Sequence, residues 1–301
     1  MLASLKQCVR RLAVQRYPLA ATLLVVFTLS QDAAGQAAAE TQFARVDLDG
    51  DGAARALQMA VVTYTSARLD GVEVDLIGAV HIGDLAYYQA LNERFARYDA
   101  LLYELVAPPD ALPQPDAEEQ SVISTTQRGL QSMLGLEFQL DHIDYAADNM
   151  IHADLSPDEF RDDMSARNES LYVYFWRAFY ASMRDASRDP LGIRSWQMLS
   201  AMLTTDDTTA FRTMVAYEMT RIDQVNQFLD GGDNGSALIA GRNARAMDVL
   251  EAELAKGHRR IGIFYGVAHM PDFERRLAAR FKLQMSRTEW VDAWLLGPEA
   301  E

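Results

Sequence analysis

The amino-acid sequence predicts an α/β fold: a central mixed sheet built from two related βα halves, with a large helical insertion that forms a cap. Two observations indicate the halves. Residues 72–106 contain an apolar run, an amphipathic segment and a second apolar run, which is the pattern of a βαβ unit. Residues 260–281 repeat the strand-to-helix pattern. Between the halves, residues of about 110–235 look helical, so we expect them to form the cap.

The first half places a histidine at the end of one strand and a carboxylate inside the next. His81 follows the apolar run at 74–80, and Asp84 can cap the helix that comes after it. The second apolar run, 100–106, has one charged interruption, Glu104, which is costly to bury unless it is paired or ligating. Ligands of open α/β sheets bind at the carboxyl ends of strands. We expect the helix between the runs to face the sheet with Leu85, Tyr88, Leu91, Phe95 and Tyr98.

The second half repeats the glycine and the histidine of the first. Gly266 and His269 follow an apolar run with the same spacing as Gly78 and His81, and each following helix ends in an Arg-Phe pair. Two such phrases in matching contexts are much harder to obtain by chance than one. We therefore expect an approximate internal symmetry that brings the two histidines together.

Composition narrows the class of protein. The 301 residues, 49% of them hydrophobic, are enough for one large domain or two modest ones. The chain carries 43 acidic and 28 basic residues, a formal charge of −15. This balance argues against nucleic acid or an anionic membrane surface as a partner.

Residues 1–39 are predicted to be a signal peptide, and residues 40–301 the α/β domain. An apolar run at 19–29, too short to span a membrane, is followed by small residues at 33–39 and preceded by Lys6, Arg10, Arg11 and Arg16. We expect an exported protein, periplasmic or extracellular, which contacts a membrane only if this segment stays uncleaved. The single cysteine, Cys8, lies before the apolar run, so the mature chain would have no disulfide and no thiolate site.

Other elements follow from local signals. Residues 43–66 indicate two strands around an Asp-rich turn at 47–52, which resembles half a calcium loop but has Gln58 where that loop needs glutamate. Ser156-Pro157 indicates a helix start. Further helices are predicted at 171–183, 209–229 and 236–256, and strand structure at 282–296. We expect the insertion to pack across the strand ends that carry the two histidines.

The candidate site is a two-histidine, one-carboxylate metal centre of His81, Glu104 and His269. Such a set leaves coordination positions open for water, as catalytic sites do. It requires the imidazole nitrogens and a carboxylate oxygen to lie within roughly 3–4.5 Å of one another. The competing interpretation of Glu104 is a buried ion pair with Arg242.

Arg242 and Asn243, early in the helix before the second half, are the other candidates. Arg242 could orient Glu104 or bind a substrate carboxylate, and Asn243 could donate to a developing oxyanion. His142 and His152, each near an aspartate, form a rival cluster whose spacing matches no metal signature, which favours turn or cap roles. The chain has neither a Gly-rich phosphate loop nor a Gly-x-Ser-x-Gly motif.

In this order the motifs resemble the TraB/GumN/TIKI family, which shares its general fold with erythromycin esterase-like and ChaN-like proteins. The resemblance covers roughly residues 72–105 and 238–296, and rests on the two Gly-x-x-His motifs, Glu104, and Arg242-Asn243 with Met247. It implies a metal-dependent hydrolase, since the TIKI branch is described as manganese- or cobalt-dependent metalloproteases; zinc is a third candidate metal.

Two functions are therefore expected from the sequence. The first is an exported metal-dependent hydrolase, a peptidase in one form of the hypothesis, that acts on a peptide or small molecule. The second is a non-catalytic binding or regulatory protein on the same fold.

The N-terminal segment generates a test of export. In a Gram-negative host we expect cleavage between about Ala33 and Glu40, because the small-residue run there suits signal peptidase. N-terminal sequencing of the purified protein measures this. An intact Met1 on protein recovered from the cell envelope would indicate an uncleaved anchor instead.

Overall fold

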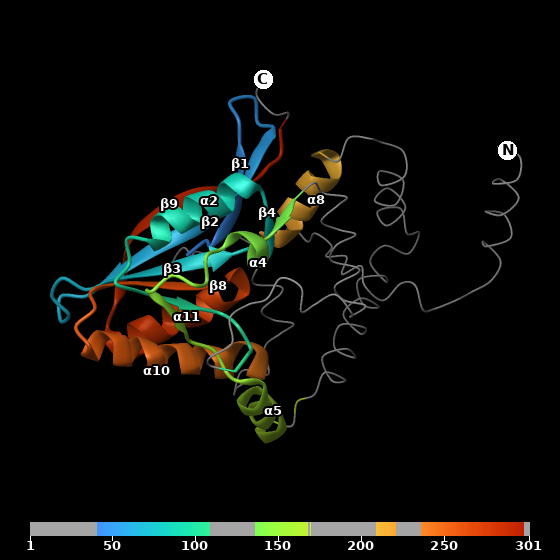
Figure 1. Ribbon diagram of the computed structural model, residues 1–301. Helices are drawn as coiled ribbons and strands as arrows, with labels where there is room; N and C mark the ends of the chain where they lie inside the picture. The colour runs from blue at the N-terminus through green and yellow to red at the C-terminus, as the bar shows by residue number, and fades with distance from the viewer. Residues whose placement is uncertain (1–40, 109–135, 168, 170–208, 221–235, 298–301) are drawn as a thin grey trace, which may run out of the picture.

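The computed structural model describes residues 41–108, 136–167, 169, 209–220 and 236–297, and Figure 1 shows their arrangement. The strands are β1 (Ala44–Leu48), β2 (Ala54–Thr65), β3 (Glu73–Ala79), β4 (Ile82–Gly83), β5 (Ala100–Tyr103), β6 (Glu137–Phe138), β7 (Met150–His152), β8 (Arg260–Gly266) and β9 (Gln284–Leu295). The α-helices are α2 (Leu85–Phe95), α4 (Gln139–His142), α5 (Pro157–Ala166), α8 (Thr209–Met219), α10 (Arg242–Ala255) and α11 (Met270–Arg276). Short π-helical segments form η2 (Ala237–Gly241) and η4 (Leu277–Phe281), and a 3₁₀ turn forms η3 (Val267–His269).

A seven-stranded mixed sheet forms the centre, which confirms the predicted α/β class. Its order is β1-β2-β3-β8-β5-β7, and β9 pairs with β2 on the edge opposite to β1 and β3. The strands β3, β8, β5 and β7 are parallel to one another, whereas β2 pairs antiparallel with β1, β3 and β9. The carboxyl ends of the four parallel strands therefore meet at one edge of the sheet.

The two predicted βα phrases lie side by side as β3 and β8, with Ala79 paired to Gly266. Their helices cover opposite faces. Phe264 packs against Phe95 at the end of α2, and the next residue, Tyr265, packs against Phe273 of α11. Because successive strand residues point to opposite faces, α2 and α11 lie in different layers (Figure 1). The phrases are neighbours, and an internal symmetry between whole halves stays a prediction.

Three details differ from the sequence analysis. Tyr87 rather than Leu85 is buried in α2, where Leu85 is 44% exposed. Glu104 lies directly after β5 rather than inside a strand. The segment predicted as helical, about 110–235, also supplies β6 and β7, so its described part is not a purely helical cap. The parallel pairing of β7 with β5 stabilises a strand too short to be recognised from its own pattern.

Several local predictions are confirmed. Ser156 caps α5 in a reciprocal capping box with Glu159. The strands β1 and β2 flank a turn in which the Asp49 carboxylate accepts hydrogen bonds from two backbone amides, so the Asp-rich stretch serves as a turn. The single long strand β9 accounts for 282–296, and Gly257, with φ of 96°, follows the end of α10.

Other predictions fall outside what is described. The N-terminal segment 1–39, the predicted helix at 171–183 and the end of the one at 209–229 lie outside the described residues. Helix α8, which belongs to the proposed cap, packs against β1 and β2. Its Arg212 forms an ion pair at 2.6 Å with Asp84, which lies three residues after His81. Within the described ranges, no helix is both long and apolar enough to cross a membrane.

The central strand β8 generates a test of packing. A side chain at Gly262 would collide with the Leu101 side chain and come within 3.1 Å of Tyr98. We expect Gly262→Ala to lower the free energy of unfolding by about 1–3 kcal/mol, as overpacking does. Urea denaturation measures it, with Gly297→Ala as control, since nothing lies within 4 Å of that position. Equal stability of the two variants would contradict this account of the core.

Candidate functional site

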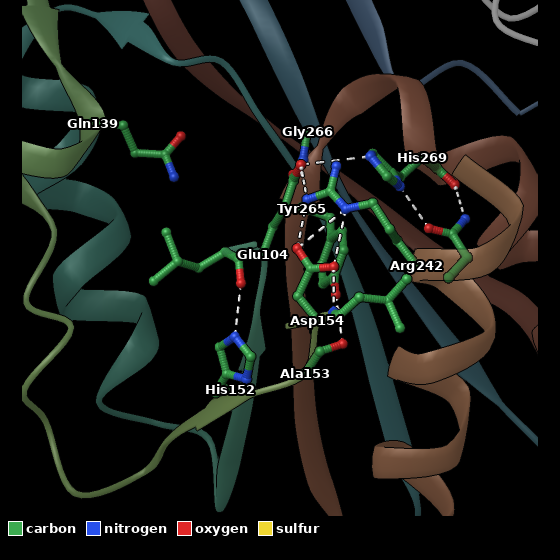
Figure 2. Close-up of polar contacts among 12 residues, drawn as sticks. Glu104, Gln139, His152, Ala153, Asp154, Arg242, Tyr265, Gly266 and His269 are labelled. Carbon is green, nitrogen blue, oxygen red and sulfur yellow. Dashed lines mark hydrogen bonds and ion pairs between the residues drawn. The ribbon is translucent and has the colours of Figure 1, made fainter. Parts of the chain in front are cut away.

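The carboxyl ends of the four parallel strands carry the site. His81 lies two residues after β3, Glu104 directly after β5, and Asp154 two residues after β7, while His269 ends the short turn after β8. Helix α10 adds its first two residues, Arg242 and Asn243. Figure 2 shows Glu104, Asp154, Arg242 and His269 turned toward one another. The structure thus brings the sequence-predicted site residues to one place, and adds Asp154.

Glu104 stands at the centre of the site. Its Oε1 accepts a hydrogen bond from Nη2 of Arg242 at 2.7 Å, and its Oε2 accepts one from the backbone N–H of Gly266 at 2.6 Å. Nε2 of His269 lies 3.5 Å from Oε1. Burial by itself would raise the pKa of Glu104, but His269, Arg242 and His81 hold that pKa well below its ordinary value. Glu104 is therefore a carboxylate in the folded protein.

Arg242 is held mainly by Asp154. Nε and Nη2 of the guanidinium donate to the Asp154 carboxylate at 2.9 and 2.5 Å, and the Asp154 side chain is fully buried. Burial would lower the pKa of Arg242, but hydrogen bonds to Asp154 and the charge of Glu104 raise it instead. Because Arg242 bridges two carboxylates, it orients Glu104, one of the two roles predicted for it. To bind a substrate carboxylate, Arg242 would have to release either Glu104 or Asp154.

Asn243 fixes the orientation and the tautomer of His269. Its Nδ2 donates to the backbone carbonyl of His269 and to Asp272, at 3.1 and 2.9 Å, so its Oδ1 is the atom that faces His269. Nδ1 of His269 lies 2.6 Å from this oxygen and must carry a hydrogen to bond it. The predicted oxyanion role of Asn243 is corrected here, because the residue is fully buried and its amide hydrogens are already donated.

Gly266 leaves the space into which the side chains converge. A methyl group on it would lie 3.2 Å from Oε2 of Glu104, 3.8 Å from Cδ2 of His269 and 3.9 Å from Nε2 of His81. Atoms of both histidines are thus within 4 Å of one point, and are separated by less than twice that distance. His81 itself is exposed, whereas His269 is buried and packs edge-on against Tyr265.

The metal requirement is met in part. His269 and Glu104 lie within the expected range, and His81 lies beside them. Across the described ranges, no three His, Asp or Glu side chains form a recognisable preformed metal group. The rival cluster does not assemble: His142 contacts Glu137 at 3.2 Å, and His152 bonds the backbone carbonyl of Leu105 at 2.7 Å.

Comparisons with models of known protein families, with curated protein sequences and with solved structures found no match. The resemblance to the TraB/GumN/TIKI family therefore stays a prediction from its motifs.

The buried Asp154–Arg242 pair generates a test of stability. We expect Asp154→Ala to lower the free energy of unfolding by about 3–5 kcal/mol, because it removes one partner of a buried ion pair. Urea denaturation measures the loss. Asp158→Ala is the matched control: Asp158 also pairs with an arginine, but its side chain is 85% exposed, so we expect a change within about 0.5 kcal/mol. Similar losses for both variants would show that burial does not strengthen the site pair.

Proposed function

We propose that this protein is an exported metal-dependent hydrolase whose metal ligands are His81, Glu104 and His269. The N-terminal segment supports export, and the motif resemblance supports peptide or small-molecule hydrolysis with manganese or cobalt, or with zinc. These supports come from the sequence. The described geometry adds one observation of its own, at the contact between His269 and Glu104.

That observation carries the proposal. Because the hydrogen on Nδ1 of His269 is donated to Asn243, neutral His269 has a bare lone pair on Nε2. This nitrogen faces the ionised Oε1 of Glu104 at 3.5 Å. Arg242 already lies beside Oε1, and the contact with Nε2 is completed by a positive charge between the two atoms, either a proton on Nε2 or a bound cation. A divalent cation in this place would be held by Nε2 of His269 and Oε1 of Glu104.

The charges of the site point the same way. Glu104 and Asp154 carry two negative charges, and Arg242 carries one positive charge. The described side chains therefore leave the buried group with a net negative charge when the histidines are neutral. Burying an uncompensated charge is costly, so the site favours a cation.

The surrounding residues fit this use of the ligands. Asn243 holds His269 in the tautomer that a metal needs, which is the usual duty of a hydrogen-bonding neighbour. Arg242, anchored by Asp154, keeps Glu104 ionised and turned toward His269. Gly266 keeps the shared space open. A metal held there would polarise a substrate carbonyl and lower the pKa of water.

Metal retention tests the proposal. We expect the native protein to bind cobalt(II) stoichiometrically in a calorimetric titration, and His81→Ala and His269→Ala each to abolish that binding, because each removes a ligand. Thermal unfolding shows whether the variants remain folded. His258→Gln is the control, since His258 precedes the opposite end of β8 and pairs with Glu253.

The outcomes separate the two predicted functions. Cobalt binding that depends on both histidines, together with cobalt-dependent cleavage of a peptide mixture, supports the hydrolase. A folded native protein that binds no cobalt, manganese or zinc would refute the metal site and favour a binding or regulatory role. Variants that lose folding but keep metal would show that the two histidines are structural.

A further inference from the structure

A second polar pair, Gln139 and Tyr145, belongs to the segment that follows His81 in space. The short strand β6 pairs with β4, which begins directly after His81, and the backbone N–H of Gln139 donates to the His81 carbonyl at 2.9 Å. Gln139 opens α4, and Tyr145 comes three residues after that helix ends. The segment is therefore attached to the first proposed metal ligand.

Tyr145 also contacts the strand that presents Glu104. Its ring packs edge-on against Tyr103, with ring centroids 5.2 Å apart, and Tyr103 is the residue before Glu104. Burial raises the pKa of Tyr145, the hydrogen bond from Gln139 opposes this, and the negative charge of nearby Glu104 raises it further. With a raised pKa, Tyr145 is a neutral phenol near neutral pH.

The pair has unused hydrogen-bonding capacity. Nε2 of Gln139 donates to the Tyr145 hydroxyl oxygen at 2.7 Å, so the hydroxyl accepts from Gln139 and its own hydrogen is free to be donated. Within the described ranges, no residue accepts that hydrogen. Oε1 of Gln139 is buried and has no hydrogen-bond partner, although both residues are only 7% exposed.

Buried polar atoms without hydrogen-bond partners destabilise the folded protein unless water or a ligand supplies the missing hydrogen bonds. Figure 2 shows the amide of Gln139 turned to the side on which Glu104 lies. Both residues lie near the proposed ligands, since Gln139 bonds the His81 carbonyl and the charge of Glu104 acts on Tyr145. This position suits a donor to a substrate held by the metal ligands.

We propose that the Tyr145 hydroxyl is a substrate-binding group that donates a hydrogen bond to the carbonyl oxygen of the scissile bond, with Gln139 as its positioning residue. The inference rests on the proposed hydrolase function. When water adds to the carbonyl carbon, the C=O bond becomes a single bond and its oxygen takes the negative charge. Tyr145 donates to this oxygen without transferring its proton. It thereby fills the oxyanion role that Asn243, with its amide hydrogens already donated, does not.

A tetrahedral anion tests the inference without turnover. Dimethylphosphinate resembles the tetrahedral intermediate, and calorimetry on the cobalt-loaded protein measures its affinity. We expect Tyr145→Phe, which keeps the ring against Tyr103, to bind it about 10- to 100-fold more weakly with unchanged cobalt content and thermal stability. Tyr217→Phe, which alters an exposed tyrosine of α8, should change nothing.

A second variant keeps the hydroxyl but redirects it. In Gln139→Glu the new carboxylate would accept the Tyr145 hydrogen, so phosphinate affinity should fall although the phenol remains. If the cobalt-loaded protein cleaves a quenched fluorogenic peptide mixture, Tyr145→Phe should lower kcat by about 10²- to 10³-fold and leave KM nearly unchanged.

The outcomes distinguish the two proposals. A native protein that binds no metal would overturn the hydrolase and this inference together. A cobalt-loaded native protein that does not bind phosphinate, or that binds it no better than Tyr145→Phe does, would overturn this inference alone and leave the metal site standing.

Discussion

A buried row of charges, Asp154–Arg242–Glu104, holds the parallel half of the sheet and its helix together. Asp154 follows β7, Glu104 follows β5, and Arg242 begins α10, so one guanidinium joins three elements. A guanidinium stays charged throughout the folded range of pH, and together with His269 it holds the pKa of Glu104 below its ordinary value. The planar guanidinium of Arg242 also helps to set the direction in which Glu104 points, and thereby its contact with His269. Packing of the core and chemistry of the site consequently depend on the same interaction.

Much of the sheet and part of the site follow from local patterns in the sequence. The apolar runs before His81 and His269 form β3 and β8, because strands buried on both faces are rich in apolar residues at successive positions. Parallel strands end at a common edge, so residues just beyond those runs meet although they are far apart in the chain. The same reasoning extends to Glu104. The sequence allows either an ion pair with Arg242 or a ligand role for Glu104, and the structure contains the ion pair together with the contact to His269.

The remaining contacts depend on partners that no local pattern specifies. Asp154 follows a three-residue strand that pairs with β5, and so short a strand gives neither itself nor the role of Asp154 a periodic signal. The orientation of Asn243 is determined by two acceptors, the carbonyl of His269 and the carboxylate of Asp272. The residues next to Asn243 in the sequence do not predict these contacts. Tyr145 gains its position from Tyr103 and Gln139 in the same way. An Arg-Asn pair at a helix start indicates that both residues make polar contacts. Which residue contacts Glu104 and which contacts His269 is known only from the structure.

The place of β8 in the sheet has a consequence for the order in which the protein folds. Strands β3 and β5 are consecutive in the βαβ unit, yet they do not pair, because β8 lies between them. Residues 260–266 must therefore be available before the first half of the chain can complete its hydrogen bonding. Such long-range closure slows folding and couples it to the end of synthesis. The parallel part of the sheet therefore stays incomplete until residues 260–266 have been made.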